Sequence, residues 1–260
     1  MSPLHAVYRL NLRVLLRSRR TLVIGLLCAF PILFATLGVI FILSGIAERD
    51  LSAYTLMAFI MARGYVHFFL VVVTLFYGTA LIADEIDDKT ITYLFMRPVS
   101  RRIIYLGKYL AYLVAASLLL LPTAVVSFLI AMIADPPGEA VQHLPILFKD
   151  LGVLILGILA YGALYALIGA VAKRPVFVGL GFAIVWETAV TFIPGYLSKM
   201  TIKHYLLALL PHAAEQRGVL SLLESPTSPP AAIAILIFIT AALLWLGSWV
   251  FTRKEYVLEQ

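Results

Sequence analysis

The densest group of charged side chains in this 260-residue chain lies between two long apolar segments, at residues 84–108. Within it, Asp87 and Asp88 stand where a short helix is expected to begin near Thr90. Acidic side chains stabilise a helix start because they accept hydrogen bonds from its free N–H groups and offset their partial positive charge. We expect this segment to be the place where the chain docks onto a partner.

The short helix expected after Thr90 carries an apolar face. Ile91, Leu94 and Phe95 follow an i, i+3, i+4 spacing, which places them on one side of a helix outside the membrane. Such a face predicts a docking surface for a protein partner. A self-contained turn that packs its apolar side against its own bundle or lipid explains the same spacing, and both interpretations remain open.

The end of this helix is also predictable. Arg97 precedes Pro98, and the residue before a proline disfavours the helical conformation. Ser100 is a suitable N-cap for a second helix that starts with Arg101 and continues into the next apolar segment. The pattern predicts a short helix, a turn and a second helix between two apolar segments.

Glu187 is the one acidic residue inside an apolar segment of spanning length. An ionisable group within a membrane segment indicates a function by default. One interpretation is contact with a substrate or a proton. The other is structural pairing with a nearby helical segment, through Lys199, Lys203 or His204.

No catalytic pattern is present. The chain has no HExxH, GxSxG or GxGxxG pattern and no GxxxxGK[ST] phosphate loop, so it does not hydrolyse ATP by itself. Its lone cysteine, Cys28, excludes a disulfide framework and a CxxC redox pair. We therefore expect no catalytic, cofactor-binding or metal-binding residues, and the chain is not expected to be an enzyme.

The elements that carry these residues follow from composition. The chain is 62% hydrophobic and 13% charged, with a mean hydropathy of +1.00, so lipid must be the solvent for much of its surface. We predict an all-α polytopic membrane protein, a single domain over residues 1–260. Six segments can span about 30 Å of hydrocarbon as helices: 21–43, 64–83, 109–134, 151–172, 175–193 and 231–252.

The basic residues orient these spans. Most of the 20 Lys and Arg residues fall before span one, after span two, after span four and after span six. The positive-inside rule then places both termini in the cytoplasm. The net charge of +6 reports this topology and anionic lipid, with no nucleic-acid partner. Residues 84–108 become a cytoplasmic loop, residues 194–230 an outer loop, and Arg63 an anchor at the outer headgroup level.

Three further segments have helical spacing. Residues 4–20 predict an amphipathic helix on the inner leaflet, with Leu4, Val7, Val14 and Leu15 opposite a basic membrane-surface face made of Arg9, Arg13, Arg17 and Arg20; a solvated positive flank is the alternative. Residues 202–210 predict a short outer helix before Pro211. In span four, small residues recur at Gly162, Ala166 and Ala170, which suits packing inside the bundle as well as dimerisation.

The run from Glu85 through Thr90, Leu94, Arg97-Pro98-Val99-Ser100-Arg101 and Leu106-Gly107-Lys108 resembles the E…GT…LL…P-[VL]-S-R…LGK pattern of ABC-2 type transporter permeases, the membrane subunits of type V ATP-binding-cassette exporters. The glycine usual before the threonine is Lys89 here. The basic N-terminal helix, the six spans and the outer helix resemble the same family, so the similarity covers essentially the whole chain.

This resemblance implies a function. The chain would be a permease subunit that couples to a separate ATPase chain, which carries the ATP and Mg²⁺, and that pairs with a second permease copy or paralogue in a bacterial plasma membrane. The loop after span two would carry the coupling helix, and spans one, two and five the substrate path. The coupling residues would be Glu85, Asp88, Thr90, Ile91, Leu94, Phe95, Arg97, Pro98, Ser100 and Arg101, with Glu85 and Arg97 as polar latches, and Glu187 a residue of the substrate path or outer gate.

Two other functions stay open. A proton-coupled secondary transporter would use Glu187 as its proton carrier, and would show paired inverted repeats and broken helices, which the sequence does not clearly contain. A membrane assembly subunit that transports nothing would need neither a proton carrier nor inverted repeats. An adjacent reading frame for a phosphate-loop ATPase would favour the exporter.

Overall fold

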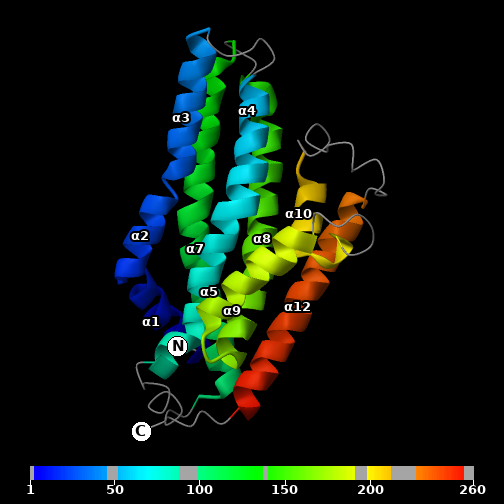
Figure 1. The fold of residues 1–260 in the computed structure, drawn as a ribbon. Coiled ribbons are helices and arrows are strands. Elements are labelled where there is room, and N and C mark those ends of the chain that lie inside the picture. The colour runs from blue at the N-terminus through cyan, green and yellow to red at the C-terminus, as the bar shows by residue number, and fades with distance from the viewer. Residues whose placement is uncertain are drawn as a thin grey trace.

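The computed structural model describes residues 3–45, 52–87, 99–136, 140–190, 198–211 and 227–254. Within these ranges the regular elements are all helices (Figure 1). Five of the described helices are long and apolar enough to cross a membrane: Arg19–Leu43, Ala53–Ile86, Arg101–Ala134, Leu144–Val171 and Pro229–Arg253. The all-helical, multi-pass class expected from composition is confirmed.

The first span is built from two helices preceded by a third. α1 (Pro3–Arg17) ends before Ser18, whose side chain caps α2 (Arg19–Leu27) by accepting from the Thr21 N–H. α3 (Phe30–Leu43) follows with Pro31 in its first turn, where a missing N–H costs nothing. The amphipathic helix therefore ends at Arg17, and Arg20 belongs to the first turn of α2 rather than to the basic face expected over residues 4–20.

The second span is longer than predicted. It runs through α4 (Ala53–Phe59), a π-helical segment η1 (Ile60–Phe69) and α5 (Leu70–Asp87). A capping box between Ser52 and Thr55 starts this helix well before Gly64, the start that we expected. Arg63 thus lies inside the helix, within η1, rather than just before its start, because the apolar residues before it join the span.

The remaining long helices are α7 (Arg101–Ala131), extended by η2 (Met132–Ala134); α8 (Leu144–Val171), preceded by η3 (Ala140–His143); and α12 (Pro229–Arg253). α8 packs against α5, α7 and α12 and forms the centre of the bundle. Ala166 and Ala170 are fully buried there, and a Cβ added at Gly162 would lie 2.2 Å from the Tyr112 ring. The small-residue repeat of span four therefore serves packing inside the bundle.

The predicted fifth span is the exception to the expected count of six. It contains α9 (Pro175–Gly181) and a second π-helical segment, η4 (Phe182–Ala189), which together are an apolar helix too short to count as a span. Nevertheless α8 and α12 both end at the same end of the bundle, since Lys254 Nζ donates to the Ala170 and Val171 carbonyls at 2.9 Å. The chain must return across the bundle between these two helices, so six crossings remain a prediction.

The bundle has two distinct ends (Figure 1). At the first, here named the α1 end, α1 lies beside the end of α5 and the beginning of α7. Toward the other end, in a region named the α10 end, η6 (Ser198–Met200) leads into the short helix α10 (Ile202–Leu209), which packs against α12, as the spacing of residues 202–210 predicted a helix there. Large apolar side chains are exposed along the outer helices between these ends, among them Leu22, Phe238 and Trp245. Lipid or a membrane partner covers such a surface.

Candidate functional site

A buried ion pair joins the end of α5 to the beginning of α7 at the α1 end. Lys108 is 4% exposed, and its Nζ donates to Glu85 Oε1 at 2.6 Å and to the Leu81 carbonyl at 3.0 Å. Glu85 and Lys108 come from the first and last parts of the motif described above. They flank residues 88–98, which lie outside the described residues. The two ends of the loop are therefore held together by charge.

This geometry follows from the cost of burying a lysine. An ammonium group withdrawn from water needs a counter-charge and hydrogen-bond acceptors, and removal of one partner from such a pair is strongly destabilising. The Leu81 carbonyl belongs to the last turns of α5, where helix carbonyls carry partial negative charge. Glu85 lies one turn further on the same face of α5, so both acceptors face the same ammonium.

A second, exposed contact ties the first span to the same place. Arg20 Nη1 donates to Asp84 Oδ1 and Oδ2 at 2.7 and 2.6 Å, with side chains 59% and 42% exposed. Such a pair contributes little to stability. Below it, the buried Tyr77 hydroxyl donates to Thr21 Oγ1 at 2.6 Å, and Thr21 in turn donates to the Leu15 carbonyl. The junction of α1 and α2 is thereby fastened to α5.

Gly107 lets α1 approach α7 closely. A Cβ at this position would lie 2.9 Å from Val7 Cγ1, closer than side chains tolerate. Val7 comes from the apolar face of α1, while Arg9, Arg13 and Arg17 are exposed. Part of the face expected to contact lipid therefore packs against the protein. Gly107 thus allows the close packing of α1 against α7, while Lys108 pairs with Glu85.

Of the predicted coupling residues, the structure describes Glu85, Ser100 and Arg101. Ser100 is the N-cap residue of α7, as predicted, although its side chain makes no capping bond. Arg101 Nη1 donates to the Thr252 carbonyl at 3.1 Å and so links the start of α7 to the end of α12. Seven others lie outside the described residues, and their role stays a prediction: Asp88, Thr90, Ile91, Leu94, Phe95, Arg97 and Pro98.

At the α10 end, Glu187 binds the start of α10. Its carboxylate accepts hydrogen bonds from the Tyr161 hydroxyl at 2.8 Å and from the backbone N–H groups of Ile202 and Lys203 at 3.1 and 3.2 Å. Glu187 is 2% exposed. A carboxylate at a helix N-terminus satisfies free N–H groups and offsets their partial charge. Glu187 therefore contacts the outer helix, as the structural interpretation predicts, through backbone groups of α10, and its place in a substrate path or outer gate stays a prediction.

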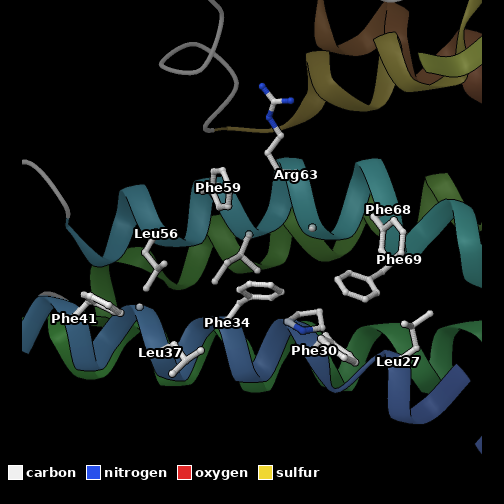
Figure 2. A pocket seen from close by; sticks show the side chains of 14 residues that line it. Leu27, Phe30, Phe34, Leu37, Phe41, Leu56, Phe59, Arg63, Phe68 and Phe69 are labelled. Carbon is white, nitrogen blue, oxygen red and sulfur yellow. The ribbon is translucent and has the colours of Figure 1, made fainter. Parts of the chain in front are cut away.

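An apolar groove runs between span one and span two (Figure 2). Phe30 and Phe34 of α3 and Phe69 of η1 lie between the two helices, and the groove has a volume of about 680 Å³. Arg63 contributes to its wall, but its guanidinium points away from Phe34. The groove interior can therefore accommodate an apolar molecule and offers it almost no polar contact.

Comparison with known proteins shows the family to which the chain belongs. The family described as ABC-2 family transporter protein matches residues 5–256. The match includes α1, both ends of the loop around Glu85 and Lys108, and the Glu187 contact with α10. No curated protein matches the chain.

Proposed function

Because the chain belongs to the ABC-2 family of transporter proteins, we propose that it is the permease subunit of an ATP-binding-cassette exporter and works with a separate ATPase chain. The observation that carries this proposal is the family match over residues 5–256, together with the motif residues Glu85 and Lys108 in direct contact. ATP and Mg²⁺ belong to the partner, and this chain supplies the membrane path.

The proposed coupling step depends on the rigid base of the loop. ATP-driven movement of the partner would act on residues 88–98 and reach span two and span three together, because the Glu85–Lys108 pair joins them. The Arg20–Asp84 pair and the α1–α7 contact would bring the first span into the same movement. A second permease copy or paralogue completes the proposed assembly, in a bacterial plasma membrane with both termini in the cytoplasm.

The groove between spans one and two supports an apolar stretch of substrate path. Its wall is formed by aromatic and aliphatic side chains of the two spans that the family resemblance implicates. The contacts of Glu187 favour a fixed structural role over proton transport, since its two oxygens accept three hydrogen bonds. This weakens the rival proton-coupled transporter.

The test is copurification of the tagged full-length chain from its native membranes. We expect a phosphate-loop ATPase to accompany the wild type, and to be lost from a Leu94→Asp/Phe95→Asp variant that is expressed and folded normally. Lys149→Asp, which alters an exposed residue at the opposite end of the molecule, should retain the ATPase. Absence of any ATPase from the wild type, or its retention by the double variant, would overturn the coupling proposal.

A further inference from the structure

Lys203 is a buried cation with no counter-charge in contact among the residues that the structure describes. It is 3% exposed in α10, and its backbone N–H donates to Glu187. Within the described chain, its ammonium group takes part in no hydrogen bond or ion pair, unlike the equally buried Lys108. The free-energy cost of burying this ammonium group is not offset by a described ion pair, and a bound ligand of opposite charge would offset it.

A second cation faces the same place. Arg63 lies on η1, which packs against α10, and its charge acts on Lys203. The Arg63 side chain is exposed, points away from the apolar groove and forms no ion pair with a described residue (Figure 2). Two cations brought together by the fold repel each other, so an anion between them would relieve the repulsion.

Among the described residues, Glu187 and His67 interact electrostatically with this pair of cations. Glu187 is the acid whose charge acts on Lys203, but its oxygens already accept from Tyr161 and from two backbone N–H groups. His67 lies one turn beyond Arg63, and its Nδ1 donates to the Ala62 carbonyl at 2.7 Å, so only Nε2 remains for a ligand. The described residues of the cluster therefore keep one positive charge in excess.

We propose that Lys203 and Arg63 form a binding site for an oxyanion, a carboxylate, sulfate or phosphate group, at the α10 end of the bundle. The guanidinium can bind two oxygens of the anion side by side, while the ammonium binds as a point charge. His67 adds a donor from Nε2 only in its protonated form. A bound anion joins span two to α10.

The oxyanion can belong to a free ion or to an amphiphile. Arg63 also forms part of the wall of the aromatic groove, so the same stretch of η1 borders both the cationic cluster and the apolar space. A phosphate attached to an acyl chain could use both features, whereas inorganic phosphate would use only the cations. The two sources share the same cationic site and differ in whether binding needs the chain.

Thermal unfolding of the purified full-length protein in a neutral detergent tests this site. Inorganic phosphate is one probe and lysophosphatidic acid is the other, with sodium chloride and lysophosphatidylcholine as their matched references. We expect a rise in unfolding temperature with at least one phosphate probe over its reference. A rise with inorganic phosphate assigns a free oxyanion, and a rise with lysophosphatidic acid alone assigns a lipid headgroup.

Substitutions locate the effect. Lys203→Gln and Arg63→Gln should each weaken the apparent affinity about tenfold or more, the expected loss of a hydrogen bond to a charged group. Lys203→Arg should retain binding, as should Lys149→Gln, an exposed lysine elsewhere. No rise with either probe in the wild type, or an unchanged rise in both Gln variants, refutes the site. Binding needs no ATPase, so this result is independent of the proposed coupling.

Discussion

At the scale of single residues, Lys108 and Glu85 carry the strongest argument. Both are charged side chains of the α1 end, and the ammonium is almost completely buried. The sequence resemblance marked Glu85 as a latch but gave it no partner. The structure supplies Lys108, and it also shows that the Leu81 carbonyl is the third member of the contact.

Lys108→Met should therefore lower the free energy of unfolding, by about 2–4 kcal/mol, because Glu85 loses its ion pair with Lys108 in a half-buried place. Adding Glu85→Gln should restore part of the loss, since the carboxylate that had paired with Lys108 is replaced by a neutral amide. A double-mutant cycle by thermal unfolding measures the coupling, expected at about 1–3 kcal/mol. Strictly additive effects would show that the two side chains do not interact.

The titration of Lys203 predicts that the free energy of unfolding depends on pH. Burial lowers the pKa of Lys203 from 10.5 to about 8, with the Glu187 carboxylate acting in the opposite direction and Arg63 in the same one. Between these two pKa values the unfolded chain binds more protons at this residue than the folded chain, so stability rises with pH. The destabilising contribution is complete below about pH 8 and vanishes above 10.5.

Lys203→Met should accordingly be more stable than the wild type at pH 7 in an oxyanion-free buffer, by about 2–4 °C in unfolding temperature for each kcal/mol removed. The difference should shrink as the pH rises toward 10. Thermal scans of both proteins across this range measure it. A difference independent of pH would mean that Lys203 does not titrate with a lowered pKa.

At the scale of elements, close helix packing depends on glycines that face backbone. A Cβ at Gly169 of α8 would lie 2.7 Å from the Thr79 carbonyl oxygen of α5, and backbone cannot move aside as a flexible side chain can. Gly152 lies on the same helix, with nothing within 4 Å of an added Cβ. The two positions form a matched pair.

We expect Gly169→Ala to destabilise the protein by about 1–3 kcal/mol, because α8 must move away from α5. Gly152→Ala should be neutral or stabilising by up to about 1 kcal/mol, since alanine favours helix. Thermal unfolding of the two variants side by side checks this. Equal effects would contradict the packing of α8 on α5.

The position of α10 depends on the side chain of Glu187. Glu187→Ala removes the acceptor for Tyr161 and for two backbone N–H groups of α10, each of which then lacks a buried partner. Glu187→Gln keeps one acceptor oxygen and should be milder. We expect proteolysis near α10 to increase in the order wild type, Gln variant, Ala variant. Loss of proton flux in both variants without any change in proteolysis would instead favour the transport interpretation.

At the scale of the whole molecule, the number of crossings decides where the termini lie. Lys254 contacts the end of α8 and Arg101 contacts the end of α12, so the described ends of the chain lie together at the α1 end. Six crossings agree with this placement, whereas five would put the termini on opposite sides of a membrane. The difference between five and six crossings depends on whether the short fifth segment crosses the membrane.

Single cysteines at His5 and Gln260, in a Cys28→Ala background, test this. With both termini in the cytoplasm, a membrane-impermeant maleimide should label neither His5→Cys nor Gln260→Cys in intact cells, and should label both after permeabilisation. Labelling of one terminus in intact cells would rule out six crossings.

The sequence by itself determined the helical class, most span positions, the capping residue Ser100 and the short helix over residues 202–209. These properties depend on local spacing and on the length of apolar runs, which neighbouring residues along the chain set. It also indicated the family, through the motif that contains Glu85 and Lys108. The structural pairing of Glu187 with the segment beyond it was one of two readings that the sequence allowed.

Only the tertiary structure decided which distant groups meet. Arg20 and Asp84 are 64 residues apart, and nothing in their local sequence favours this pair over contact with lipid. The π-helical segments η1 and η4 change which side chains face α10, and no residue pattern announced them. Contacts between helices depend on their rotation and depth, which the packing of the whole bundle sets. For this reason the surroundings of Lys108, Lys203 and Gly107 became visible only in the fold.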